Sequence, residues 1–228
     1  MAGLWISRPT QRPAAGARIN WAHPLTVGLG DYWDWGLGDT YNLAYPQDAT
    51  FPGTTRPALR GDGFYISNGD GVQYARHDRA YGVGADFSLL LEMTWVSSDS
   101  TYSCVLAAGG AGGNLALYLN TSGEIRFFTL AGSNADALNR PAFTANVRRQ
   151  LVITRQSSTV QAYVDGATSG ASWTNSGNSD NGYTSIGFRQ VDNARIVGTY
   201  HRAAIWHRAL SADEIRDLAA EPYALLTR

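Results

Sequence analysis

Apolar and polar residues alternate in short runs along most of the chain, a pattern that predicts β-strands joined by tight turns. One hairpin is expected through residues 115–119 and 125–130, and a second through 151–154 and 160–164. The second hairpin ends at Asp165-Gly166, a dipeptide suited to a turn with positive φ. Further strands are expected at 25–35, 59–67, 73–75, 87–96, 102–107, 184–187 and 200–206.

The clearest helix signal follows the last of these strands. Ser211 and Glu214 have the spacing of a capping box, in which each side chain bonds the backbone N–H of the other residue. Leu210 and Ile215 have the spacing of a hydrophobic staple around the same helix start. Pro222 cannot continue a helix, so the sequence predicts one short helix that begins just after Ser211.

Short strands, 25 glycines and a single terminal helix favour an antiparallel sandwich over a fold with helices between strands. We therefore predict an all-β, two-sheet antiparallel jelly-roll sandwich with one short C-terminal helix. Residues 1–18 are expected to form an N-terminal arm, 19–222 the sandwich and 223–228 a C-terminal tail. Strict alternation in the last strand predicts two faces, one with His201, Ala203 and Ile205, the other with Tyr200, Arg202 and Trp206.

A family resemblance rests on the same C-terminal region. The run 206–215, Trp-His-Arg-Ala-Leu-Ser-Ala-Asp-Glu-Ile, resembles the last strand and closing helix of concanavalin-A-like (laminin-G/pentraxin-type) jelly-roll domains. The resemblance extends over 19–222 and implies a lectin-like domain. Two departures stand out: bacterial relatives usually carry Asp-Glu where this chain has His201-Arg202, and many have Trp-His within 147–150.

The balance of charges and the targeting signals in the sequence limit which partners we expect. Eighteen basic residues, all arginine, face nineteen acidic ones, so there is no basic surface of the kind that binds nucleic acid or an anionic membrane. No apolar run approaches the ~18 residues of a membrane span, and the first residues do not resemble a signal peptide. We therefore expect no nucleic-acid or membrane partner, and synthesis in a reducing cytoplasm, where the single Cys104 is a buried hydrophobe.

Enzymes of this shape hydrolyse glycans with paired carboxylates that alternate on one strand. The four glutamates do not form such a pair: Glu92 lies within a leucine-rich strand, Glu124 borders a turn, Glu214 caps the helix and Glu221 precedes a proline. The sequence therefore predicts that the protein is not an enzyme.

Two kinds of ligand site can be suggested. Calcium needs clustered oxygen ligands from loops, and its candidate ligands are Asp180, Asn181, Asp192 and Asn193, with Asn175 and Asn178 nearby. Metal-free sugar binding needs an aromatic platform, for which the candidates are Trp33, Trp35, Trp173 and Tyr183. Turn formation explains the first set equally well and core packing the second, so both interpretations stay open. Calcium is the one candidate cofactor.

The Pro- and Arg-rich arm is too poor in apolar residues to fold alone, which is typical of a segment that orders on a partner. Its expected contacts are the apolar residues Trp5 and Ile6 and the cations Arg8, Arg12 and Arg18. A tail that folds back on its own domain is the alternative.

Near its start the chain has Ser7-Arg-Pro-Thr-Gln-Arg-Pro13 followed by Ile19-Asn-Trp-Ala-His-Pro-Leu-Thr-Val-Gly-Leu29, and near its end it has Glu221-Pro-Tyr-Ala-Leu-Leu226. These runs resemble the ends of jelly-roll proteins encoded among the structural genes of tailed bacteriophages. The resemblance implies a non-enzymatic virion protein, assembled in the host cytoplasm in several copies, with capsid or tail subunits and a host-surface glycan as candidate partners. Head decoration or head-fibre-like attachment is favoured. A bacterial carbohydrate-binding lectin is the alternative, and a glycan hydrolase the third.

Overall fold

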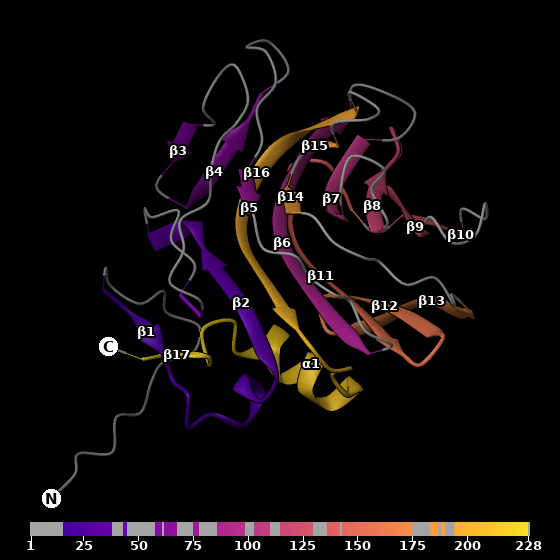
Figure 1. Cartoon of the computed structure of the whole chain (residues 1–228). Helices are drawn as coiled ribbons and strands as arrows, with labels where there is room; N and C mark the ends of the chain where they lie inside the picture. Colours follow the sequence, from indigo (N-terminus) through magenta and orange to yellow (C-terminus); the bar gives the residue numbers. More distant parts are fainter. Residues whose placement is uncertain are drawn as a thin grey trace, which may run out of the picture.

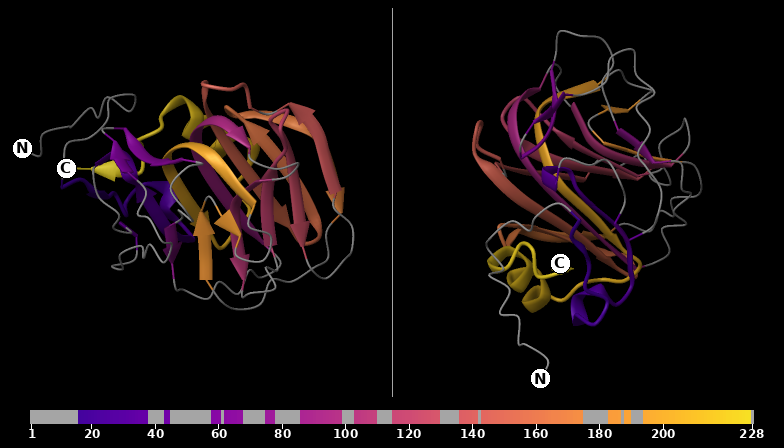
Figure 2. Two further views of the ribbon diagram at one scale, coloured as in Figure 1. Left: turned by 90° about the horizontal axis from the view of Figure 1, so that it is seen from above. Right: turned by 90° about the vertical axis from the view of Figure 1, so that its left-hand side faces the viewer.

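Two antiparallel sheets face each other, with a two-stranded sheet and one α-helix at one end of the sandwich (Figures 1 and 2). The computed structural model describes residues 16–37, 43–44, 58–60, 62–67, 75–77, 86–98, 103–109, 115–129, 136–141, 143–174, 183–186, 188–189 and 194–227. Every strand pairing within these residues is antiparallel. The predicted all-β jelly-roll sandwich is confirmed.

The larger sheet has the order β13-β12-β11-β6-β16-β4-β3, and β2 and β15 also pair with β16. Its strands are β2 (Leu29–Asp34), β3 (Ala58–Arg60), β4 (Gly63–Ile66), β6 (Phe87–Ser98), β11 (Arg148–Gln156), β12 (Thr159–Val164), β13 (Ala167–Thr174), β15 (Phe188–Arg189) and β16 (Ala194–Trp206). The long strands β6, β11 and β16 curve together through the middle of the molecule (Figure 1).

The smaller sheet has the order β10-β9-β8-β7-β14-β5. Its strands are β5 (Ala75–His77), β7 (Ser103–Gly109), β8 (Leu115–Leu119), β9 (Glu124–Thr129), β10 (Asp136–Pro141) and β14 (Tyr183–Ile186). The predicted β8–β9 hairpin is present. Its turn is held by the Asn120 side-chain oxygen, which accepts from the backbone N–H groups of Ser122 and Glu124.

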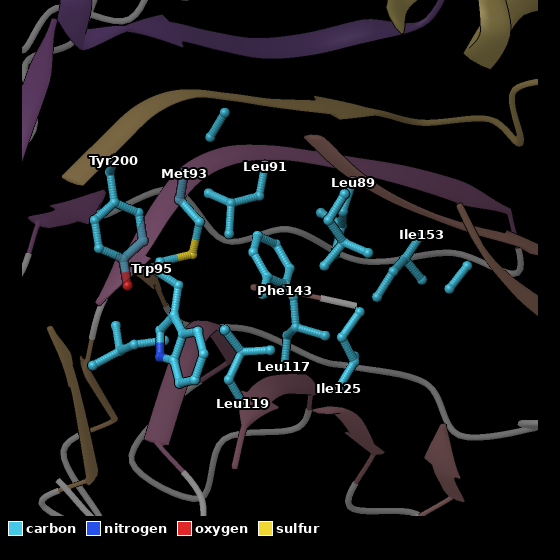
Figure 3. Packing of buried hydrophobic residues seen from close by; sticks show 14 of the residues in the cluster. Leu89, Leu91, Met93, Trp95, Leu117, Leu119, Ile125, Phe143, Ile153 and Tyr200 are labelled. Atoms are coloured by element: carbon cyan, nitrogen blue, oxygen red, sulfur yellow. The ribbon is translucent and has the colours of Figure 1, made fainter. Parts of the chain in front are cut away.

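The main hydrophobic core fills the space between the sheets. Alternate residues of β6 point into it and meet residues of the smaller sheet (Figure 3). The β6 residues are Leu89, Leu91, Met93 and Trp95, and the opposing ones include Leu117, Leu119 and Ile125. The core therefore rests on the period-2 pattern that the sequence shows.

A second apolar layer covers part of the outer face of the larger sheet. Leu90 and Trp206 of the sheet pack there with Ile215 and Leu218 of α1 (Ala212–Ala220). Ser211 forms the predicted capping box with Glu214. Within the described chain, no helix has the length and apolar character needed to cross a membrane.

The two ends of the described chain meet in a small sheet of β1 (Arg18–Ile19) and β17 (Leu226–Thr227). Ala17, Leu225 and Leu226 are buried in the outer apolar layer. The packed unit therefore runs from Ala17 to Thr227 and is longer than the predicted 19–222. The reason is that apolar residues at both ends pack into the outer apolar layer.

The strand expected at 25–35 is shorter in the structure. A 3₁₀ turn, η1 (Pro24–Thr26), precedes β2, and a second, η2 (Trp35–Leu37), follows it. The His23 ring nitrogen accepts from the Leu25 N–H and fixes the first turn. Gly28, at φ 76°, then reverses the chain into β2.

Candidate functional site

The outward-facing residues of β6 change from apolar to charged along the strand. Leu90 lies beneath the outer apolar layer, Glu92 follows it on the same face, and Thr94 beyond it is partly exposed. The strand register puts Gln150 of β11 and Arg202 of β16 opposite Glu92. Charged side chains from neighbouring strands thus gather where the apolar layer ends.

A bulge in β16 decides which side chains reach this face. The register shifts between Tyr200, which pairs with Met93, and Arg202, which pairs with Glu92, so His201 is an extra residue. Tyr200 points into the main core, whereas Arg202 and His201 lie on the outer face. The predicted alternation, with Tyr200 and Arg202 on one face, is wrong here because it assumed an unbroken register.

The Glu92 carboxylate is shared by two arginines. Its Oε2 accepts from Nε of Arg202, and its Oε1 accepts from Nε of Arg148. Burial on its own would raise the pKa of Glu92, but the two guanidinium groups outweigh it and hold the pKa below the usual value. Glu92 is therefore a fixed anion. Asp34, buried on β2, is a further negative charge near Arg202.

His201 is buried and hydrogen-bonded through both ring nitrogens. Nδ1 contacts the Asp62 carbonyl oxygen, and Nε2 lies 2.9 Å from Thr94 Oγ1. Because a carbonyl only accepts, Nδ1 carries the proton and Nε2 accepts from the threonine hydroxyl. Burial lowers the pKa of His201, and the nearby charge of Arg148 lowers it further. The ring is therefore neutral near pH 7.

The C-terminal segment reaches the same place. The Tyr223 ring centroid lies 5.1 Å from the guanidinium carbon of Arg202. Burial would lower the pKa of Arg148, yet the Glu92 carboxylate and the Tyr223 hydroxyl raise it overall. We refer to Glu92, Arg148, His201, Arg202 and Tyr223 together as the Glu92 cluster.

Most charges of the cluster are buried, and only its edge meets solvent. The side chain of Arg202 is 2% exposed and that of Glu92 10%, but that of Arg148 is 40% exposed. Thr94 and Tyr223 are partly exposed, and Asp62, with its carboxylate 3.8 Å from His201 Nδ1, is exposed. The surface thus offers fixed donors and acceptors beside an aromatic ring, a set able to bind a hydroxyl-rich ligand.

Two residues of the predicted aromatic platform are buried in the structure. Trp33 is 1% exposed and Trp35 0%, and both belong to the main core, so neither has a face free to stack on a sugar. Trp173 lies in β13 of the larger sheet and Tyr183 in β14 of the smaller one. These two strands belong to different sheets, and a sugar contact by Trp173 or Tyr183 stays a prediction.

The remaining predicted site residues are the calcium candidates and the residues of the arm. The calcium candidates Asp180, Asn181, Asp192 and Asn193, with Asn175 and Asn178, and the arm residues Trp5, Ile6, Arg8 and Arg12 lie outside the described residues. Arg18 is exposed in β1. Among the residues that are described, no three His, Cys, Asp or Glu side chains are arranged to hold a metal ion.

The sequence interpretation missed the Glu92 cluster, although one signal pointed to it. Both departures from the family pattern, at residues 147–150 and at His201-Arg202, lie in this cluster or directly beside it. A buried arginine in place of an acidic residue needs a new counter-ion, and Glu92 supplies it. That pairing depends on strand register and cannot be read from one strand alone.

Residues 67–216 match the family described as the concanavalin A-like lectin/glucanases superfamily. The chain belongs to this superfamily. No curated protein matches the chain in sequence. Superfamily membership explains the two facing sheets but does not identify the ligand.

Solved structures with the same fold include sugar-processing enzymes. A Trypanosoma rangeli sialidase in complex with sialic acid is similar at a TM-score of 0.64 and 18% identity, over 85% of this chain and 33% of the sialidase chain. Domain 4 of AbnA, a GH43 extracellular arabinanase from Geobacillus stearothermophilus, in complex with arabinotriose, is similar at a TM-score of 0.62 and 16% identity. That match covers 84% of this chain and 98% of the domain. The chain spans about a third of the sialidase chains it matches.

The prediction that the protein is not an enzyme is contradicted by these neighbours. The fold is shared with chains of a sialidase and a GH43 arabinanase. The lack of paired carboxylates that alternate on one strand of the sequence therefore does not separate this chain from proteins that act on glycans. Superfamily and neighbours together support a carbohydrate-binding or glycosidase-type domain.

Proposed function

We propose that the protein is a carbohydrate-binding domain and that the Glu92 cluster forms part of its ligand site. The similarity to the arabinanase domain supports this, because it covers 98% of a domain solved in complex with arabinotriose. A unit of this size therefore corresponds to one whole domain of that enzyme.

The observation that carries the proposed site is the position of Arg148. Its guanidinium is partly exposed, yet it is fixed from beneath by Glu92 and lies beside the Tyr223 hydroxyl. Sugar recognition requires polar groups held in place before the ligand arrives, because ordering flexible side chains costs binding free energy. Arg148, which is held by Glu92 and lies beside Thr94 and Tyr223, meets that requirement.

The test is a glycan array, followed by calorimetric titration of any ligand found, with the full chain and two single variants. Arg148→Ala should weaken binding about tenfold or more, as expected for loss of a hydrogen bond from a charged group. Arg149→Ala is the matched control, since Arg149 has a similar exposure, 37%, and its own ion pair with Asp165. Equal losses in both variants would place the site elsewhere on the domain, and no binding to any glycan would contradict the proposed function.

A second candidate, glycoside hydrolysis, is favoured by the sialidase and arabinanase neighbours. Incubating the full chain with each glycan of the same array and measuring released reducing ends tests it directly. Product formed in proportion to protein concentration would support it. An unchanged substrate on a glycan that the protein binds would reject it for that glycan.

We further propose that this domain is a virion component, in head decoration or head-fibre-like attachment, bound to capsid or tail subunits through the arm. Its support is the resemblance of the chain ends to phage structural proteins and the apolar and arginine content of the arm. The deletion that tests it should remove residues 2–15, because Ala17 is buried and Ile19 belongs to β1. The truncated domain should fold but not join particles.

Mass spectrometry of purified particles measures this outcome and also separates the virion role from that of a bacterial lectin. Truncated protein present at full occupancy would show that the contact lies on the sandwich, not on the arm. Absence of even the full-length chain from the particles would favour the lectin.

A further inference from the structure

We propose that the ligand carries a carboxylate, as uronic and sialic acids do, and that Arg148 binds that carboxylate. The proposal rests on the carbohydrate-binding function above and specifies the class of sugar. Membership of the superfamily does not distinguish acidic from neutral glycans, so the class of sugar follows from the residues themselves.

The charges around Glu92 are ordered from the interior to the surface. The group of ion-paired charges around Glu92 has two negative members, Glu92 and Asp34, and two positive ones, Arg148 and Arg202, and the exposed Asp62 carboxylate lies at its edge beside His201. Asp34, Glu92 and Arg202 are buried, and Arg148 alone among the four is substantially exposed. Among these four residues, an approaching ligand therefore meets the positive Arg148 first, whereas Glu92 and Asp34 lie deeper.

The orientation of the Arg148 guanidinium is set by its partners. Arg148 uses its Nε edge on Glu92 Oε1, and Glu92 cannot turn away because its other oxygen is held by Arg202. A guanidinium has five N–H donors in a planar fork. With the ε edge occupied and the Tyr223 hydroxyl as the other neighbour, N–H groups remain for an external acceptor.

A carboxylate is the acceptor whose shape matches such an edge. Two oxygens in one plane accept two parallel N–H bonds, and charge-assisted bonds of this kind are about twice as strong as neutral ones. A neutral hydroxyl uses only one donor at a time and adds no charge. The fixed arginine should therefore prefer the acidic sugar over a neutral one of the same shape.

The experiment compares matched ligands that differ only in the carboxylate. Oligogalacturonate is titrated against its methyl-esterified form, and sialyllactose against sialyllactose methyl ester, with the full chain by calorimetry. The wild type should bind at least one free acid about tenfold or more tightly than its neutral partner. This preference should weaken at high salt, because screening reduces the attraction between exposed charges.

Three variants assign the effect to Arg148. Arg148→Gln should lose the preference and bind acid and neutral partner alike, Arg148→Lys should keep part of it through the remaining charge, and Arg149→Gln should behave as wild type. Arg148→Lys also serves if Arg148→Gln does not fold, as judged by circular dichroism. An unchanged preference in the Arg148 variants, or tighter binding of the neutral sugars by the wild type, would overturn this proposal while leaving the carbohydrate-binding function intact. A wild type that binds no glycan would instead remove the proposed function itself.

Discussion

Replacing Glu92 by Gln tests the central feature of the outer face, a carboxylate shared between a buried and an exposed arginine. The substitution keeps the size and shape of the side chain but removes its charge. Arg202, whose side chain is 2% exposed, then loses its ionic partner in the interior. Arg148, at 40% exposure, loses the same partner where water can replace it.

Breaking a buried ion pair by removing one partner typically costs about 3–5 kcal/mol. We expect the lower end, about 3 kcal/mol, because Asp34 lies near Arg202 and the Gln oxygen can still accept one hydrogen bond. Arg148→Gln removes the exposed partner of the same carboxylate and should cost only about 1 kcal/mol or less. For a domain of this length each kcal/mol corresponds to about 2–4 °C in Tm.

Urea unfolding at pH 7.5, followed by tryptophan fluorescence, measures both variants under one set of conditions. The free energy of unfolding should be highest for the wild type, slightly lower for Arg148→Gln and much lower for Glu92→Gln. The slope of this free energy against urea concentration should be the same for all three proteins. Equal losses of about 1 kcal/mol in the two variants would refute the reasoning. The charge of Arg202 would then be balanced by Asp34 or by water and not by Glu92.

Three further predictions concern the helix cap, pH and calcium. Ser211→Ala should lower the free energy of unfolding by about 1 kcal/mol in the same urea assay, because the Glu214 N–H loses the oxygen to which it donates. An unchanged urea midpoint of unfolding would mean that the cap does not stabilise the protein. Burial lowers the pKa of His201 in the folded protein, so as pH falls this histidine is protonated in the unfolded chain before it is protonated in the folded one. The free energy of unfolding should therefore decline below about pH 6.5, by at most about 1.4 kcal/mol per pH unit. His201→Gln should reduce that decline, and an identical slope in the variant would exclude His201 as its source. If calcium binds the loops at 175–193, EDTA should lower the Tm by mass action; an unchanged melting curve would leave those residues as turn formers.

The fold follows largely from patterns that one segment contains by itself. The alternation around Leu117 and Leu119, the turn at Asp165-Gly166 and the Ser211–Glu214 capping box each concern residues near in sequence. The structure bears all three out: the leucines enter the core, Asp165 and Gly166 adopt φ of 50° and 80°, and the box closes. Local backbone preference and burial of one strand face require no knowledge of the partner strand.

The two ends of the chain show where local patterns were insufficient. Leu225 and Leu226 follow Pro222 with no periodicity, and 223–228 was expected to be a tail. Both leucines are buried beside Ala17, because β17 pairs with β1 from the opposite end of the chain. The two segments are some 200 residues apart, and the sequence of neither one indicates that they pair.

Sequence alone determined that this chain makes an antiparallel sandwich closed by a capped helix, since burial of alternating residues and helix capping act over a few positions. The candidate site, in contrast, depends on contacts between strands far apart in the sequence. Glu92 meets Arg148 and Arg202 through the register of three strands, and a single extra residue, His201, turns Arg202 outward. A one-residue shift in register exchanges the two faces of a strand, and hydrogen bonds between strands, not the sequence of any one strand, fix that register.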